Sequence, residues 1–154
     1  MKIISGGQTG ADQAGVDAAK FYNLETGGWM PHGWTTLNGS KPEYAELYGM
    51  QEHKSVGYPP RTKQNVFDSD GTLIIAGNFS SPGTKLTINA TSLFKKPVYT
   101  SDFNNPTANE AENIHQWIIE KNIKILNIAG NSESSFPGIY EYSRSLLILV
   151  FEKL

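Results

Sequence analysis

Short apolar runs alternate with longer amphipathic stretches along the chain, and the two kinds of run predict different elements. The run Gly71-Thr72-Leu73-Ile74-Ile75-Ala76 is continuous rather than alternating, which is typical of a strand buried on both faces. Strands are expected over residues 2–5, 26–30, 71–76, 97–100 and 124–129.

Helical patterns occupy the intervals between these strands. In the clearest helix, apolar residues recur at helical spacing, at Ala111, Ile114, Trp117 and Ile118. That helix starts with Thr107 and Glu110, which have the spacing of a capping box. Helices are expected over residues 11–22, 42–48, 61–67, 82–94, 107–122 and 137–153.

The alternation of strands and helices predicts an α/β fold with a parallel sheet covered on both faces. The length of 154 residues suits a single domain over residues 1–154. The helix over residues 137–153 is apolar on all sides, which indicates burial on two sides and a contact between subunits, although residues 146–151 also fit a strand. In such sheets ligands bind outside the carboxyl ends of the strands.

Composition narrows the classes of function. The net charge is −2 and no basic stripe is visible, which argues against a nucleic-acid partner. The absence of cysteine excludes disulfides and thiolate metal sites. The N-terminus lacks the apolar segment of a signal peptide, and no run approaches the roughly 20 apolar residues of a membrane span. We therefore expect a cytoplasmic protein without a membrane partner.

Three strand-end turns share one chemistry. Residues 5–10, 77–84 and 130–138 each follow a predicted strand, lead into a helix, and are rich in Gly, Ser, Thr and Asn. Helix N-termini carry unpaired N–H groups and partial positive charge, and glycine lets a ligand approach the backbone. Hydroxyl groups add neutral donors, so these turns could bind phosphate without a lysine.

Known phosphate motifs do not match these turns. Gly6 and Gly7 are adjacent, which excludes the dinucleotide pattern, and Val16-Asp17 replace the Lys and Ser/Thr of a P-loop. Each turn also has a structural explanation on its own, because Thr9 and Asp12 have capping-box spacing and Ser81-Pro82 is an ordinary helix start. The occurrence of all three turns at one edge of the sheet favours a binding site.

Several motifs occur in the order found in a known family, and the match runs nearly end to end. The chain resembles the putative molybdenum carrier family, in the YpsA-like branch of the LOG (lysine-decarboxylase-like) superfamily of Rossmann-like proteins. The motifs are Gly6-Gly7-Gln8-Thr9-Gly10-Ala11-Asp12, Trp29-Met30-Pro31-His32-Gly33-Trp34, Tyr58 with Arg61-Thr62 and Asn65, Asp68-Ser69-Asp70, Pro82-Gly83-Thr84, Asn127-Ile128-Ala129-Gly130 and Pro137-Gly138-Ile139.

This resemblance implies a doubly wound, mostly parallel sheet with helices on both faces, in a protein that forms dimers or tetramers. It implies a phosphorylated ligand at the strand ends, which is either a nucleotide or the pterin phosphate of molybdenum cofactor. The protein would then be a carrier or a sensor. Enzymes of the wider superfamily release the base from nucleoside monophosphates, but here Thr87 stands in place of their catalytic Glu. The hydrolase alternative would need another carboxylate, such as Asp12, Asp68 or Asp70.

Arg61 is the best candidate for a charged phosphate contact, with an ion pair to Asp68 or Asp70 as the structural alternative. Trp34 is the best candidate for stacking on a ring. His32, His53 and His115 lack metal-ligand spacing, so no zinc is expected. The predicted binding residues are Gly6, Gly7, Gln8, Thr9, Gly10, Asp12, Trp34, Arg61, Thr62, Asn65, Ser81, Gly83, Thr84 and Gly130.

Overall fold

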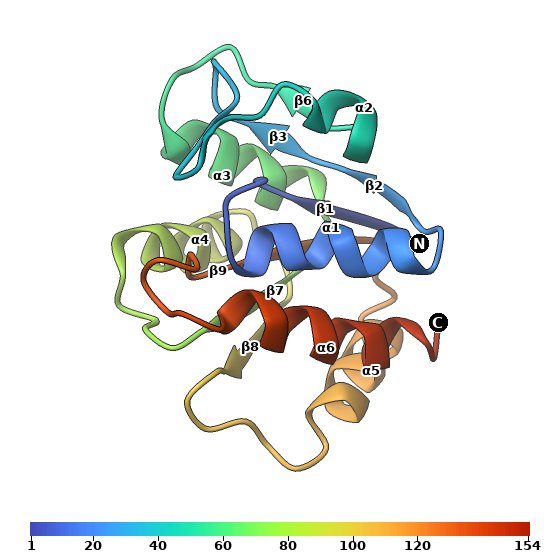
Figure 1. Ribbon diagram of the computed structural model, residues 1–154. Helices are drawn as coiled ribbons and strands as arrows, with labels where there is room; N and C mark the ends of the chain where they lie inside the picture. The colour runs from blue at the N-terminus through green and yellow to red at the C-terminus, as the bar shows by residue number, and fades with distance from the viewer.

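The buried apolar runs form the central sheet of the computed structural model, which describes residues 1–154 (Figure 1). Every neighbouring pair of strands in this sheet is parallel, and the strand order is β2-β1-β9-β7-β8. The last strand thus lies between the first and the middle strand of the chain, and the predicted α/β, Rossmann-like class is confirmed. The strands are β1 (Lys2–Ser5), β2 (Glu25–Gly27), β7 (Gly71–Ala76), β8 (Val98–Asp102) and β9 (Ile125–Gly130).

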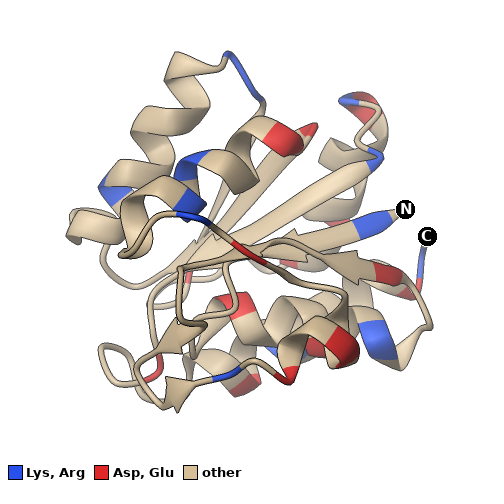
Figure 2. Ribbon diagram, turned by 90° about the horizontal axis from the view of Figure 1, so that it is seen from above, with Lys and Arg blue, Asp and Glu red and all other residues tan.

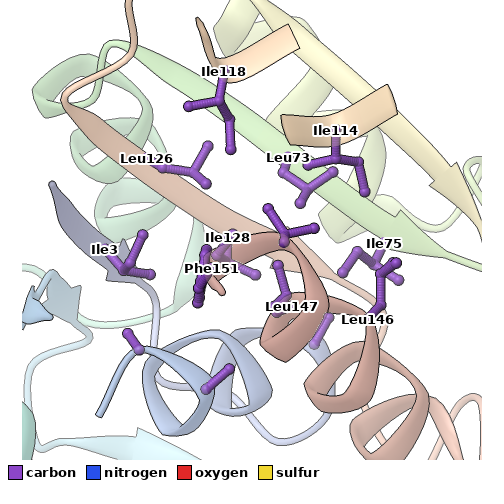
Figure 3. Close-up of a cluster of buried hydrophobic side chains, with 14 of the residues drawn as sticks. Ile3, Leu73, Ile75, Ile114, Ile118, Leu126, Ile128, Leu146, Leu147 and Phe151 are labelled. Atoms are coloured by element: carbon purple, nitrogen blue, oxygen red, sulfur yellow. The ribbon is translucent and has the colours of Figure 1, made fainter. Parts of the chain in front are cut away.

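Three helices cover one face of the sheet and enclose a large apolar core. They are α1 (Ala11–Phe21), α5 (Glu110–Glu120) and α6 (Ile139–Phe151). Figure 3 shows side chains such as Ile128 of β9 and Leu147 of α6 meeting in this core. Residues 146–151 continue α6 as a helix, so their strand alternative is wrong. The helix packs against α1 and α5, and its residues Leu146, Leu147, Val150 and Phe151 are buried in this core, whereas Leu149 is exposed.

The opposite face is covered by α3 (Tyr58–Asp68) and α4 (Pro82–Leu93), and its interior combines apolar side chains such as Ile74 and Val66 with many polar ones. Successive side chains of a strand point to opposite faces of the sheet. Leu73, Leu126 and Ile128 belong to the apolar core beneath α1, α5 and α6. Thr72 and Asn127 therefore face α3 and α4. Buried polar side chains of the two helices on this side are Arg61, Thr62, Asn65, Thr84, Thr87 and Thr91.

Residues 29–52 form a small layer beyond α3 with its own apolar cluster. The cluster joins Val16 of α1 to Met30, Tyr44, Tyr48 and Met50. The elements of this layer are β3 (Trp29–Met30), β4 (Thr35–Thr36), β5 (Gly39–Ser40), α2 (Tyr44–Tyr48) and β6 (Gln51–Glu52).

The strand predicted over residues 26–30 is interrupted at Gly28. Gly28 has φ 124°, and a Cβ there would lie 2.0 Å from the Ser5 carbonyl oxygen. The chain therefore leaves the main sheet at this residue, and β3 pairs with β6 instead. A contact with β1, distant in sequence, decides this break.

Four helix starts differ from the prediction, and the largest differences, of three residues each, are at α3 and α5. Helix α3 begins at Tyr58 and includes both prolines in its first turn, where their missing N–H groups cost nothing. Helix α5 begins at Glu110 rather than Thr107, and the Thr107 hydroxyl donates to the Glu110 carboxylate. The capping box is therefore not formed at the predicted position.

The surface carries both signs of charge, and Figure 2 shows basic and acidic residues interspersed along the ribbon. None of the helices combines the length and apolarity needed to cross a membrane.

Candidate functional site

The carboxyl ends of β1, β9 and β7 lie side by side, and a cleft of about 400 Å³ opens above them between α3 and α4. We call it the strand-end cleft. The predicted residues that line it are Gly6, Gln8, Asp12, Arg61, Thr62, Asn65, Ser81, Gly83, Thr84 and Gly130. The fold thus brings together residues from all three glycine-rich turns and from α3, as the sequence predicted.

Arg61 is a buried cation in this cleft. Its side chain is only 10% exposed, and its guanidinium lies 5.3 Å from the centroid of the Tyr58 ring. Nη1 donates to Thr62 Oγ1 at 2.7 Å, whereas Nε is buried with no hydrogen-bond partner. Burial lowers the pKa of the guanidinium, and the nearby Asp12 carboxylate opposes this shift. A buried cation with an unpaired donor is a group that an anionic ligand would stabilise.

The glycine at position 6 makes this arrangement possible. A Cβ on Gly6 would lie 2.3 Å from Nη1 and 2.4 Å from Cζ of Arg61. The guanidinium therefore packs directly on the backbone of the first turn.

Asp12 is the carboxylate closest to Arg61, with 3.8 Å between Oδ2 and Nη2. Its Oδ2 also accepts a hydrogen bond from the Gln8 N–H at 3.4 Å. Burial raises the pKa of Asp12 to about 6, against the lowering effect of Arg61. The carboxyl group can therefore exchange a proton near neutral pH.

The alternative ion pair of Arg61 with Asp68 or Asp70 is wrong. Asp68 accepts from Trp29 Nε1 at 2.7 Å, and Asp70 accepts from the backbone N–H groups of residues 124 and 125. Neither aspartate lines the strand-end cleft.

Asn65 holds two strand ends in place. Its Oδ1 accepts from the Trp29 N–H at 2.8 Å, and its Nδ2 donates to the carbonyl oxygens of Ser5 and Trp29 at 3.2 and 3.0 Å. Although Asn65 lines the cleft, these bonds engage both ends of its amide. Its main physical role is to position the backbone around the Gly28 break.

The first turn of α4 presents unpaired donors to the cleft. The N–H groups of Gly83 and Thr84 make no backbone hydrogen bond, and no side chain caps this helix. Thr84 Oγ1 accepts from Ser81 Oγ at 3.0 Å and from Asn131 Nδ2 at 3.2 Å. Because both lone pairs of the Thr84 oxygen are engaged, its hydroxyl proton is available to a ligand.

Asn131 connects two of the turns and was not among the predicted site residues. Its Oδ1 accepts from the N–H groups of Gly77 and Asn78, both at 2.9 Å, while its Nδ2 donates toward Ser81 and Thr84. Its position directly after a buried strand and a glycine was the available sequence signal.

The N-termini of α1, α4 and α6, which follow the three glycine-rich turns, differ in the carboxylates near them. At α6 the Glu133 carboxylate accepts from the N–H groups of Gly138 and Tyr140 at 2.6 and 2.9 Å. At α1 the Asp12 carboxylate lies against the turn. Helix α4 is the one of these three without a carboxylate at its first turn, so it offers the best phosphate position.

Four predicted residues lie outside the cleft lining. Gly7 packs against Met30, and Thr9 is buried in the turn, where its N–H donates to Gln8 Oε1 at 2.9 Å. Gly10 has φ 86°, and a Cβ there would lie 2.4 Å from the Asn131 carbonyl oxygen. Trp34 packs on the apolar cluster of Met30 and its neighbours.

Other residues that line the cleft were absent from the predicted set. Tyr58, Leu37 and Leu86 contribute apolar surface, while Thr87 and Asn127 contribute polar groups. The Thr87 hydroxyl donates to the Gly83 carbonyl at 3.0 Å. No three His, Asp or Glu side chains are grouped so that they could hold a metal ion.

Two comparisons with known proteins bear on this site. The family model described as the circularly permutated YpsA SLOG family matches residues 3–151. The crystal structure of a putative molybdenum carrier protein from Syntrophus aciditrophicus SB is 39% identical, with a TM-score of 0.90, and the match covers 97% of this chain and 93% of that chain. No curated protein matches the chain. The family resemblance indicated by the sequence motifs is therefore confirmed.

Proposed function

The chain belongs to the circularly permutated YpsA SLOG family, and from this premise we propose that the strand-end cleft binds a phosphorylated heterocyclic ligand. The phosphate would lie at the first turn of α4, against the N–H groups of Gly83 and Thr84 and the Thr84 hydroxyl. Arg61 would supply the positive charge. The observation that carries this proposal is the buried guanidinium of Arg61, whose Nε lacks a partner in a cleft with unpaired helix donors.

We propose molybdenum cofactor or a nucleotide as the ligand, with the protein acting as a carrier or a sensor. The similarity to a putative molybdenum carrier protein supports the pterin ligand. The residues of the cleft suit a phosphate and the polar edge of a ring, because they offer neutral donors, amides and one guanidinium. The chain has no thiolate, so it would hold such a cargo through its phosphate and pterin ring.

A ligand panel tests this function by thermal shift and calorimetry. The panel contains AMP, GMP, ADP-ribose, NAD, molybdenum cofactor and its metal-free pterin precursor, with inorganic phosphate as the control. A ligand at 100 times its Kd stabilises the fold by about 2.7 kcal/mol. We expect Thr84→Val and Arg61→Lys each to weaken binding by roughly tenfold or more, which corresponds to loss of a charge-assisted or helix-terminal hydrogen bond.

Lys63→Met provides the matched control, because Lys63 is exposed on the same helix as Arg61 and does not line the cleft. This variant should bind like the wild type. Wild-type affinity in both the Thr84 and the Arg61 variants would overturn the proposed phosphate position. A shift with pterin ligands alone would support a carrier, and a shift with an adenine nucleotide alone would support a nucleotide sensor.

A second candidate function is the hydrolysis of a nucleoside monophosphate to release its base. One observation favours it: Asp12 lines the cleft and burial raises its pKa to about 6, which suits a general acid that protonates the leaving base. Chromatography of each nucleotide after incubation with the protein would detect the free base. Release that is lost in Asp12→Asn would support the hydrolase, and no release from any nucleotide would reject it.

A further inference from the structure

Asn127 is a polar residue in the middle of buried strand β9. It is 3% exposed, and its register partners are Ile4 of β1 and Thr72 of β7. The adjacent residues Leu126 and Ile128 belong to the apolar core on the opposite face of the sheet. Asn127 therefore faces the α3 and α4 layer, and it lines the strand-end cleft.

The hydrogen bonds of this amide are incomplete. Nδ2 donates to Thr72 Oγ1 at 3.3 Å, and Oδ1 accepts no hydrogen bond. Because Asn127 lines the cleft and Oδ1 is not enclosed by protein, this acceptor is accessible to a ligand, and a Leu at this position would cost the fold only the one hydrogen bond. The structural role visible in the fold is thus one long hydrogen bond, which does not explain a primary amide here.

The Asn127 amide has the donor and acceptor groups needed to hydrogen-bond the edge of a heterocyclic ring. Asn127 presents one acceptor, Oδ1, and a second N–H on Nδ2, both in one plane. Purines and pterins carry an exocyclic amino group or ring N–H beside a ring nitrogen or carbonyl oxygen. An Asn amide pairs with such a donor–acceptor edge through two hydrogen bonds, as it does with adenine in DNA recognition.

We propose that Asn127 determines the ligand specificity of the cleft by pairing its amide with the donor–acceptor edge of a fused nitrogen heterocycle. This inference rests on the proposed function, since it assumes that the phosphate of the same ligand lies at α4. Asn127 hydrogen-bonds the ring, while Gly83 and Thr84 bind the phosphate, so the two ends of the ligand are recognised independently.

Binding of ring-bearing and ringless probes separates these two roles. The probes are AMP, GMP and the metal-free pterin precursor on one side, and ribose 5-phosphate on the other. For the wild type we expect at least one ring-bearing probe to bind tenfold or more tightly than ribose 5-phosphate. Asn127→Leu should remove most of that difference and change ribose 5-phosphate affinity by less than twofold. Asn127→Thr, which suits a strand and also lacks the amide, serves if the Leu variant does not fold.

Thr72→Val is the matched control. It removes the same hydrogen bond between residues 72 and 127, but Thr72 does not line the cleft and the Asn127 amide stays in place. A purely structural role predicts equal behaviour of the Asn127 and Thr72 variants, and that result would overturn the inference. Wild-type protein that prefers no ring over ribose 5-phosphate would also overturn it and leave the phosphate position intact. Failure of every probe, including ribose 5-phosphate, would reject the proposed function itself.

Discussion

At the scale of single residues, the protonation of Asp12 makes the free energy of unfolding depend on pH. The pKa of Asp12 rises from 3.8 to about 6 on folding because the carboxylate is buried. Between pH 3.8 and about pH 6, the Asp12 carboxyl group is therefore mostly protonated in the folded protein and mostly ionised in the unfolded chain. The resulting stabilisation is fully present below pH 3.8 and is lost as pH rises through about 6.

This shift predicts a pH-dependent effect of Asp12→Asn, which cannot ionise. The free energy of unfolding of the variant relative to wild type should increase by roughly 1–3 kcal/mol between pH 4 and pH 7, since one pKa unit corresponds to 1.36 kcal/mol. Denaturant unfolding at several pH values measures this difference. Glu46→Gln, which alters an exposed carboxylate on α2, is the control. A difference for Asp12→Asn that does not change with pH would contradict the prediction.

At the scale of elements, the side chain of Gln8 hydrogen-bonds the β4–β5 hairpin to the first glycine-rich turn. Gln8 Oε1 accepts from the N–H groups of Thr9 and Leu37, both at 2.9 Å. Since both neighbours are donors, the orientation of this amide is fixed, with Nε2 directed away from them. Leu37 lines the cleft although the residue is 55% exposed. Gln8 therefore connects the first glycine-rich turn to Leu37, the apolar hairpin residue that lines the cleft.

Gln8→Ala should release this hairpin. We expect faster amide exchange at Leu37 and a loss of about 1 kcal/mol in the free energy of unfolding, the usual net value of such hydrogen bonds. Gln8→Glu keeps an acceptor for both N–H groups and should retain slow exchange. Exchange at Leu37 that is equally slow in both variants would show that Gln8 does not hold the hairpin.

The elements also show what the sequence could predict. The strand over residues 71–76 was predicted with its observed bounds because a continuous apolar run defines it. Helix α4 was predicted to within one residue because a proline marks its first turn. The break at Gly28, the start of α5 and the pairing of Arg61 with Asp12 were not predictable. The break at Gly28 and the pairing of Arg61 depend on contacts between segments distant in sequence, Gly28 with Ser5 and Arg61 with Asp12. The late start of α5 reflects a local choice, because the Thr107 hydroxyl donates to the Glu110 carboxylate instead of capping the Glu110 N–H.

At the scale of the whole molecule, the two faces of the sheet differ in what holds them together. The face with α1, α5 and α6 is closed by a continuous apolar cluster. The face with α3 and α4 carries buried threonines, asparagines and Arg61 around an open cleft. Burial of apolar surface dominates stability, so the first face should form the most stable part of the fold.

Hydrogen exchange tests this asymmetry. Amides of α3 and α4 should exchange faster than those of α1 and α6, and a bound ligand should slow exchange in α3 and α4 most, because it supplies the missing polar partners. Leu147→Ala, in the apolar core, should cost about 2–5 kcal/mol, whereas Thr91→Val should cost about 1 kcal/mol or less. Uniform exchange over both faces, with uniform protection by the ligand, would mean that the cleft is as rigid as the core. In that case the polar interior beneath α3 and α4 would be complete without a ligand.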